Sequence, residues 1–586
     1  MSLSVQKWFC VLILCMFSHD VVAKTVRRNV LFIMADDLRP TLGCYGDPIV
    51  KSPNIDQLAS KSNVFLNAYA QQAVCGPSRT SLLTSRRPDT TRLYDFNSYW
   101  RVHAGNYTTL PQYFKSKGYT TMSVGKVFHP GIASNHSDDY PYSWSVPPYH
   151  PPSFKYENMK VCKGSDGKLH ANLLCSVNVS ETPLGTLPDM ESTEEAIRLL
   201  KSTRDSGKNF FLAVGFHKPH IPFRIPQDFL TLYPLDKMSL PPDPYVPKGL
   251  PSVAYNPWTD IRKREDVQAL NISFPYGPIP KDFQKATGRS SILYYSRLHT
   301  VVVLIYHKCW LQLQIQQHYY ASVSYMDSQV GRLLNTLDYL GLAEDTVVVF
   351  TSDHGWSLGE HGEWAKYSNF DVATRIPLMF YVAGVTAVRP WPETFPYINV
   401  FGPTPHRFTR GRTVSNVNEL LDIFPTVSVL AGLKPPLPCP DNSFDVELCT
   451  EGHDLAYTFN NDDNRKKSEA IAFSQYPRPA DTPQENSDLP DLKDIRIMGY
   501  SLRSWDYRFT VWAGFDPAIF QANLSDVHGG ELYLLEEDPG QDHNLYNTSE
   551  HSLLLCKLGQ GQQPWAQTLK QHLLYLTAGN KSKGMA

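Results

Sequence analysis

The stretch Asn29-Val30-Leu31-Phe32-Ile33-Met34 is a nearly continuous apolar run, and the carboxylates Asp36 and Asp37 follow it. Such runs are typical of strands that are covered on both faces of a sheet. Three further β-rich runs also end in charged or imidazole side chains. These are residues 120–124 before Lys126 and His129, residues 210–214 before His217 and His220, and residues 346–350 before Asp353 and His354.

Helical spacing occurs between these runs. Residues 319–340 carry apolar side chains at every third or fourth position, so one stripe of a helix would face a core. Alternating strands and helices predict an α/β fold with helices on both sides of the sheet. In such sheets ligands collect at the carboxyl ends of the strands, where the polar residues lie. Taken singly, any of these residues could equally be a helix cap or a satisfied core group.

The composition of this polar group favours one kind of chemistry. Asp36, Asp37 and Asp353 are hard oxygen donors, and together with His354 they suit Ca²⁺ or Mg²⁺ better than zinc. Lys126, His129, His220 and Arg79 add cationic or proton-transferring groups. A metal, cations and a nucleophile together predict displacement at an anionic ester of sulfur or phosphorus.

Cys75 is the candidate nucleophile. It lies in Ala73-Val74-Cys75-Gly76-Pro77-Ser78-Arg79-Thr80, and Pro77 suits the first position of a helix. The N-terminus of that helix would be a ready anion site. The alternative is a small buried cysteine or half of a disulfide, which is common in secreted chains.

The sequence as a whole predicts a secreted glycoprotein of more than one domain. Its 586 residues carry a net charge of -2, so nucleic acid is not an expected partner. Residues 1–23 predict a signal peptide, and no later run predicts a membrane span. The spacings of Cys162 with Cys175 and of Cys439 with Cys449 are most simply two local disulfides, although spacing does not prove pairing. Seven asparagines lie in glycosylation sequons: Asn106, Asn135, Asn178, Asn271, Asn523, Asn547 and Asn580.

The residues 75–79 resemble the Cys-x-Pro-Ser-Arg signature of the type I sulfatases. The match continues through residues 83–88, although the family usually has Gly where Ser85 stands. Residues 92–101, 215–223 and 352–364 also match, and the resemblance covers roughly residues 28–285 and 316–550.

The resemblance implies an alkaline-phosphatase-like fold, with a large mixed sheet flanked by helices and a smaller C-terminal domain with an antiparallel sheet. It implies that the formylglycine-generating enzyme converts Cys75 to formylglycine, whose hydrate attacks sulfur and then releases sulfate. It also implies one Ca²⁺ per subunit, with His220 as the acid and His129 as a base. The implied metal ligands are Asp36, Asp37, Cys75, Asp353 and His354, and the implied groups around the sulfate are Lys126, His129, His220 and Lys366, with Arg79 in support.

Within the family, the likeness is greatest to the members that remove the 2-O-sulfate of terminal iduronate from heparan sulfate and dermatan sulfate. These members act in the lysosome, which implies delivery through the mannose-6-phosphate receptor by way of the glycans. Two alternatives are a phosphodiesterase or phosphatase of the alkaline phosphatase superfamily, and an inactive glycosaminoglycan-binding pseudoenzyme. Cys75 and the scarcity of histidine ligands count against the first, and the intact motif residues count against the second.

The expected organisation is a catalytic domain over residues 24–460 and a smaller domain over residues 461–586. Residues 286–314 form an atypical insert before a helix that is expected to begin near Gln316. This insert is a surface excursion or a translated intron, and it contains no motif that supports a binding function. The tail from about residue 550 also diverges from the family pattern. Neither departure contains a proposed catalytic residue.

Overall fold

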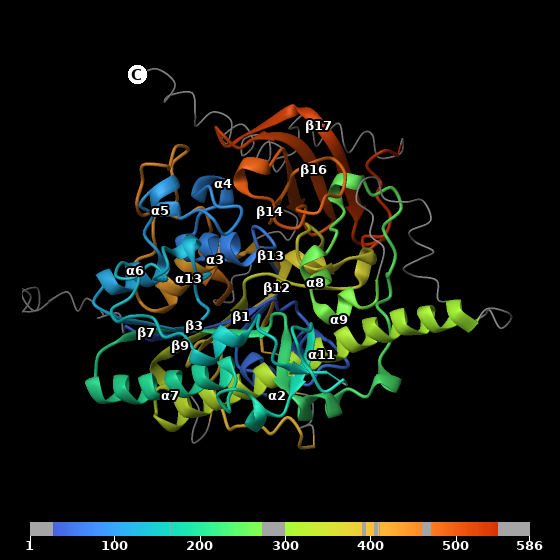
Figure 1. The fold of residues 1–586 in the computed structure, drawn as a ribbon. Coiled ribbons are helices and arrows are strands. Elements are labelled where there is room, and N and C mark those ends of the chain that lie inside the picture. The colour runs from blue at the N-terminus through green and yellow to red at the C-terminus, as the bar shows by residue number, and fades with distance from the viewer. Residues whose placement is uncertain are drawn as a thin grey trace, which may run out of the picture.

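The computed structural model describes residues 27–164, 166–271, 299–388, 394–403, 408, 411–459 and 470–548 (Figure 1). The predicted signal peptide, the first part of the insert and the divergent tail lie outside these residues. No helix among the described residues is long and apolar enough to cross a bilayer. All six sequon asparagines that are described are exposed.

A seven-stranded mixed sheet forms the centre of the molecule, in the order β13-β2-β12-β9-β1-β7-β3. Strand β1 pairs in parallel with β7 and β9, whereas β12 runs antiparallel to β9 and β2. The α/β prediction with a mixed sheet is therefore confirmed. The strands are β1 (Asn29–Asp36), β2 (Asn63–Tyr69), β3 (Thr120–Gly125), β7 (Phe210–Pro219), β9 (Thr346–Ser352), β12 (Arg375–Val382) and β13 (Thr413–Glu419).

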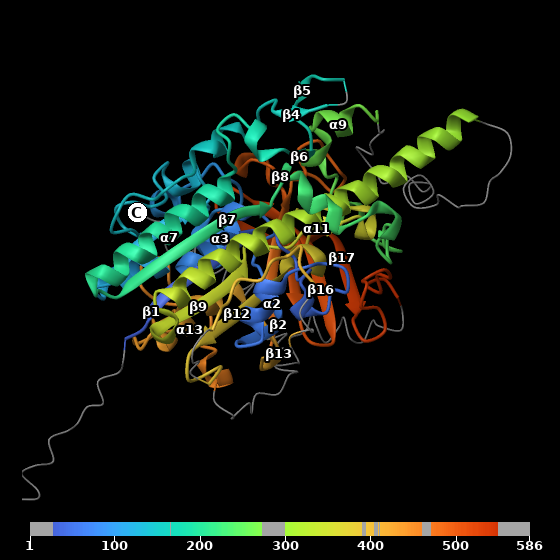
Figure 2. The same cartoon turned by 90° about the horizontal axis from the view of Figure 1, so that it is seen from below.

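Helices cover both faces of this sheet (Figures 1 and 2). Alternate side chains of β1 explain the two layers, because Leu31 and Ile33 join one hydrophobic cluster while Val30 and Phe32 join the other. The first face carries α2 (Pro53–Ala59), α7 (Pro188–Ser206) and α11 (His299–Tyr339). The second face carries α3 (Cys75–Thr84), α6 (Leu110–Ser116) and α13 (Ile423–Leu430).

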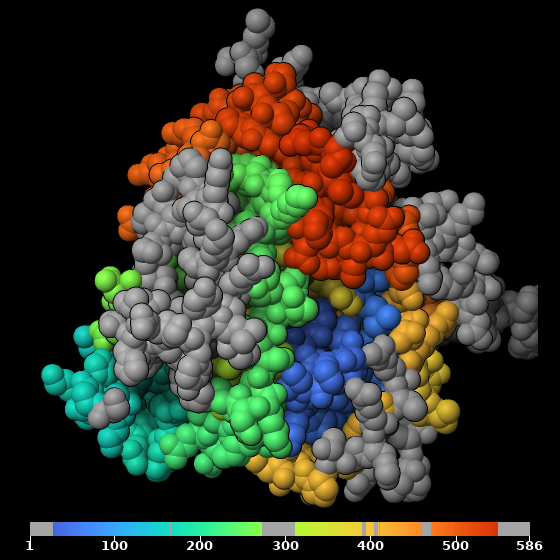
Figure 3. Space-filling model, turned by 90° about the vertical axis from the view of Figure 1, so that its right-hand side faces the viewer, coloured from blue at the N-terminus to red at the C-terminus, as the bar shows by residue number. Residues whose placement is uncertain are grey.

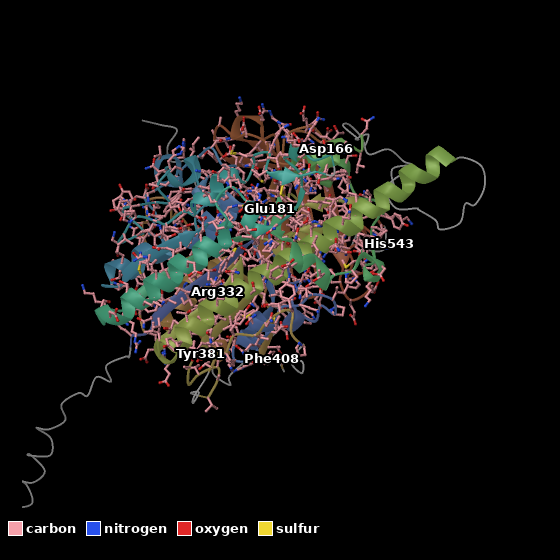
Figure 4. The ribbon with its side chains drawn as sticks, turned by 60° about the horizontal axis from the view of Figure 1, so that its bottom comes forward. Asp166, Glu181, Arg332, Tyr381, Phe408 and His543 are labelled. Atoms are coloured by element: carbon pink, nitrogen blue, oxygen red, sulfur yellow. A yellow bond between two sulfur atoms is a disulfide. The ribbon has the colours of Figure 1, made fainter. Side chains whose placement is uncertain are left out.

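Helices α7 and α11 lie side by side, and an ion pair between Arg332 and Glu194 joins them (Figures 2 and 4). The sequence predicted that the second of these helices begins near Gln316, but α11 begins at His299. The last part of the predicted insert is therefore helical and continuous with the core helix.

The C-terminal segment forms a separate four-stranded antiparallel sheet, in the order β14-β15-β16-β17. Its strands are β14 (Ala472–Arg478), β15 (Ile497–Arg503), β16 (Tyr507–Asp516) and β17 (Gln521–Leu534). In Figure 3 this orange-to-red segment lies against the green segment near residue 250, where the amide of Lys248 donates to the carbonyl of Asp542 at 2.7 Å. The antiparallel sheet expected for the smaller domain is thus present.

Short elements complete the fold. The two expected disulfides, Cys162–Cys175 and Cys439–Cys449, are formed. The short helices are α4 (Pro88–Thr91), α5 (Trp100–His103), α8 (Thr259–Arg262), α9 (Glu265–Gln268) and α12 (Asp371–Thr374), and the short strands are β4 (Cys162–Lys163), β5 (Leu169–His170), β6 (Leu174–Val177), β8 (Phe223–Pro226), β10 (Ser357–Leu358) and β11 (Trp364–Ala365).

Candidate active site and metal centre

Five buried side chains converge where β1 and β9 end. Parallel strands direct their carboxyl ends to one edge of the sheet, so residues more than 300 positions apart meet there. Each side chain offers one ligand atom, and these atoms all lie within 4.8 Å of one another. The five are the predicted metal ligands Asp36, Asp37, Cys75, Asp353 and His354.

Cys75 is the first residue of α3, which begins two residues before the start predicted at Pro77. The amide of Ser78 donates to the carbonyl of Val74, which is the first hydrogen bond of the helix. Pro77 still fits, because the first amides of a helix have no partner within it. The thiol sulfur lies 3.4 Å from Asp36 Oδ1 and 3.4 Å from His354 Nε2.

Three cations balance the three carboxylates of this cluster. Lys126 Nζ lies 2.5 Å from Asp36 Oδ2, and Lys366 Nζ lies 2.8 Å from Asp37 Oδ1. The guanidinium of Arg79 bonds Asp353 Oδ2 at 2.8 Å and Asp36 Oδ1 at 3.0 Å. Because each acid has a basic partner, the charges can remain buried.

The cations and the burial act in opposite directions on the acids. Burial disfavours the charged form of Asp36, but Lys126 and Arg79 outweigh it and hold its pKa well below the usual value. Burial raises the pKa of Asp37 in spite of Lys366. Burial also raises the pKa of the Cys75 thiol well above its usual value, with Asp36 adding to the effect. An unmodified Cys75 is therefore a poor thiolate nucleophile here.

The donor set fits a hard divalent cation. Three carboxylates with one imidazole are the oxygen-rich ligands that Ca²⁺ takes. Asp37 Oδ2 is also buried without a hydrogen-bond partner among the described residues. A cation at this position would satisfy that oxygen, which would otherwise be costly to bury.

Two further predicted residues, His129 and His220, lie beside the cluster. The ring of His129 stacks on Phe96 with 3.9 Å between the ring centroids. His220 Nε2 lies 3.9 Å from Asp37 Oδ2. Burial, reinforced by Lys126, lowers the pKa of both imidazoles well below the usual value. Both therefore favour the neutral form.

A cavity of about 820 Å³ opens above this cluster. Five predicted residues line its inner part: Cys75, Lys126, His129, His220 and Lys366. Arg79 and the remaining metal-ligand candidates lie buried beneath. The structure thus brings together every residue that the sequence analysis placed in the site.

Several residues around this cavity have no role predicted from the sequence. Lys218 is buried, and its ammonium donates to the carbonyls of His220 and Pro222, which holds the loop that carries His220. The position of Lys218 between His217 and His220 is the sequence feature that could have marked it as part of the site. Lys263 and Asp488 also line the cavity, but no motif marks them.

A second group, Asp243, His361 and Asp542, also has the spacing of metal ligands. His361 Nε2 donates to the carbonyl of Gly540 at 2.7 Å. Nε2 of His361 is therefore already used in a hydrogen bond that joins the catalytic part to the C-terminal segment.

Comparisons with known proteins extend over most of the chain. A family profile described as Sulfatase matches residues 28–433. The curated iduronate 2-sulfatase of mouse is 61% identical over 539 residues, which covers 90% of this chain and 93% of the relative. The human iduronate 2-sulfatase is 61% identical over 531 residues, which covers 89% of this chain and 92% of the relative.

Solved structures share the fold at much lower identity. One is a complex with its substrate D-glucosamine-2-N,6-O-disulfate, with a TM-score of 0.59, 20% identity and coverage of 95% of this chain and 100% of that chain. Another is the phosphonate monoester hydrolase of Agrobacterium radiobacter, with a TM-score of 0.60, 19% identity and coverage of 94% and 96%. At these identities the likeness concerns the architecture alone.

Proposed function

This chain belongs to the sulfatase family, and from that premise we propose that it removes the 2-O-sulfate from terminal iduronate in heparan sulfate and dermatan sulfate. The family predicted from the sequence is confirmed, and with it the class of sulfuric ester hydrolases. The observation that carries the proposal is the position of Cys75 at the floor of the cavity, between the acidic cluster and Lys366. The 61% identity to two iduronate 2-sulfatases supports the choice of sugar.

We propose Ca²⁺ as the metal, held by Asp36, Asp37, Asp353 and His354 together with Cys75. When bound, the ion would polarise the sulfate oxygens and the oxidised Cys75 would supply paired hydroxyls for attack and release. The protein groups of the cluster are three carboxylates facing three cations. A divalent ion would therefore leave positive charge in excess, which suits an anionic ester.

The two lysines are placed to stabilise charge on the sulfate. Asp36 outweighs the burial of Lys126 and raises its pKa, and Asp37 does the same for Lys366. Both ammonium groups therefore stay protonated at acidic and neutral pH. Lys366 Nζ lies 3.1 Å from the Cys75 sulfur, so it can bond an oxygen on the group that replaces that sulfur.

We propose His220 as the group that protonates the leaving sugar oxygen and His129 as the base for sulfate release. Burial and Lys126 hold the pKa of His220 low without substrate, so the acid role requires that the bound anionic ester raise this pKa and let the imidazole take up a proton. His220 is partly exposed, with a side chain 20% exposed, and it lines the cavity. His129 is held flat against Phe96 on the same cavity wall. Arg79 bonds Asp36 and Asp353 from below and is not itself one of the residues that line the cavity.

We propose lysosomal action with entry through the secretory pathway. The predicted signal peptide over residues 1–23 and the six exposed sequon asparagines support this route. The proposed partners are the formylglycine-generating enzyme, which would modify Cys75, and the mannose-6-phosphate receptor, which would bind the glycans.

We also propose the division into a catalytic domain over residues 24–460 and a smaller domain over residues 461–586. The two separate sheets support it. A distinct hydrophobic cluster within the C-terminal sheet, which includes Met498, Leu502 and Leu532, supports it further.

The test is hydrolysis of 4-methylumbelliferyl iduronide 2-sulfate compared with the corresponding phosphate ester, with peptide mass spectrometry at Cys75. We expect sulfate release by protein whose Cys75 is oxidised, and little phosphate release. Cys75→Ser should fold with an unchanged melting temperature yet lose turnover, because a serine lacks the second hydroxyl. Preferential phosphate release would favour the phosphatase alternative, and no release by folded, modified protein would favour the pseudoenzyme.

A further inference from the structure

The cavity above Cys75 extends well beyond the sulfate-binding groups. Its inner part is made by buried residues, since Lys126 and Lys366 are only 6% and 3% exposed. Its outer part is made by three separate segments, at residues 154–158, 259–264 and 484–489. The volume of about 820 Å³ lies in the range of pockets that enclose molecules larger than a single sugar.

The cations of the inner part are already engaged. Lys126 and Lys366 each form a close ion pair with a carboxylate of the metal cluster. Either can bond the sulfate, but neither is available for a second anionic group of the substrate. Any recognition of further charges must therefore come from the outer part.

Lys263 is one of two cations of the outer part, with Arg264, that form no ion pair in the described structure. It directly follows α8, lines the cavity and is exposed. Among the described residues its ammonium has no ion pair and no side-chain hydrogen bond. The neighbouring Arg264, by contrast, donates to Asn158 Oδ1 at 3.2 Å.

The acids near Lys263 are engaged elsewhere. Asp260 accepts a hydrogen bond from the hydroxyl of Tyr367 at 2.8 Å. Asp488 accepts from the hydroxyl of Thr259 at 2.8 Å, and burial raises its pKa to about 6. Glu157 and Glu485 also line the cavity, without an ion pair to Lys263 in the described structure.

The plain alternative is a solvated lysine that favours the carboxyl end of its helix. That effect is small here, because α8 has only four residues and the macrodipole grows from aligned peptide units. Position on the wall of the substrate cavity is the feature that sets Lys263 apart from other exposed lysines, such as Lys201 on α7.

We propose that Lys263 binds the anionic group of the sugar that follows the terminal iduronate, and so selects substrates that are sulfated at that second sugar. This inference rests on the proposed function. The iduronate sulfate occupies the buried floor near Cys75, so the rest of the chain must lead outward past the exposed wall. A sulfated amino sugar at that point carries a charge that an unpaired ammonium can bind.

The test compares three substrates that share the terminal 2-O-sulfated iduronate. These are the 4-methylumbelliferyl glycoside, a disaccharide with N-sulfated glucosamine and a disaccharide with N-acetylated glucosamine. Lys263→Gln should lower the ratio of kcat/KM for the N-sulfated over the N-acetylated disaccharide about two- to fivefold, as expected for an exposed charge pair. The effect should appear in KM and should shrink at high salt.

Two control variants make the result specific. Lys263→Arg should retain the ratio, because it retains the charge, and Lys201→Gln should leave both the ratio and the rates unchanged. An unchanged ratio in Lys263→Gln, or an equal loss on all three substrates, would overturn the inference. Failure of the wild-type protein to act on any of the three would instead overturn the proposed function.

Discussion

Arg79 shows how one side chain can hold the acidic cluster together. It is fully buried, and its guanidinium links Asp36 at the end of β1 with Asp353 just after β9. It also donates to the carbonyl of Val127 at 3.1 Å. A planar fork with several donors can serve all these acceptors at once, which a single ammonium cannot do.

Arg79→Lys should therefore cost both stability and metal affinity. We expect the free energy of unfolding to fall by at least about 2 kcal/mol, because one carboxylate of the pair loses its partner while buried. Calcium binding, measured by equilibrium dialysis, should weaken. Unchanged unfolding in urea would show that the lysine reaches both acids.

Glu363 gives the molecule a dependence of stability on pH. The carboxyl is buried and accepts a hydrogen bond from the backbone amide of Asn256 at 2.7 Å. Burial is the main reason that its pKa is raised to about 8. The unfolded chain ionises near pH 4.5, whereas the folded chain holds the proton until about pH 8. The contribution of Glu363 is therefore most favourable in acid and is lost as the pH rises between these values.

Glu363→Gln should remove the loss of stability that ionisation of Glu363 causes as the pH rises. The variant should match the wild type near pH 4.5 and become more stable than it at higher pH, by about 1.4 kcal/mol per pH unit at most. Thermal unfolding of both proteins at several pH values provides the measurement. Parallel curves for the two proteins would contradict the assignment.

At the scale of an element, α3 ends in a left-handed residue that is not glycine. Ser85 has a φ of 54° and caps the helix that begins with Cys75. Its hydroxyl donates to the carbonyl of Leu421 at 2.6 Å and lies 2.7 Å from the hydroxyl of Thr450. These contacts explain how serine can stand where the sulfatase pattern usually has glycine.

Replacing Ser85 by Gly and by Ala separates the two effects. Ser85→Gly loses the hydroxyl contacts but relieves the left-handed backbone, so the net change should stay within about 1 kcal/mol. Ser85→Ala loses the contacts and keeps the strain, so it should be less stable than the glycine variant by about 1 kcal/mol. Chemical denaturation ranks the variants, and alanine at or above glycine would refute this account.

The elements that the sequence predicted share a local signal. Residues 29–34 and 346–350 are apolar runs that end in acids, and these runs lie within β1 and β9. Strand β2 carried no such signal, because Asn63 and Asn67 interrupt its apolar pattern. The antiparallel place of β12 within the sheet depends on contacts between distant segments, which local patterns do not encode.

The residues of the site also divide into those with a local sequence signal and those without one. Cys75 and Arg79 belong to a contiguous motif, and its resemblance to a family identified them. Lys263 is an ordinary surface residue in sequence, and only its place on the cavity wall distinguishes it.

At the scale of the whole molecule, Arg478 joins the C-terminal sheet to the active site. It is buried, and its guanidinium donates to five backbone carbonyls, those of Val253, Ala254, Tyr367, Pro477 and Ser487. Tyr367 follows Lys366 directly, so this contact fixes the loop that carries a proposed sulfate ligand.

Arg478→Met should lower the free energy of unfolding by about 3 kcal/mol or more, since it leaves several buried carbonyls unpaired. The variant should also show a raised KM through the loosened Lys366 loop. Arg496→Met, an exposed neighbour on the same domain, serves as the control and should stay within about 0.5 kcal/mol. Equal effects of the two substitutions on the free energy of unfolding would contradict the proposed role of Arg478 in joining the C-terminal sheet to the active site.

The central place of β1 has a consequence for synthesis on the ribosome. This strand emerges among the first segments of the chain, yet its partners β7 and β9 begin only at Phe210 and Thr346. Strand β1 has neither neighbour until β7 is translated and lacks β9 for a further stretch of the chain, and contacts of such long separation form slowly. Cys75, which is 1% exposed in the complete fold, is enclosed in part by His354 and Lys366, so we expect its thiol to be accessible on the growing chain until these residues are added.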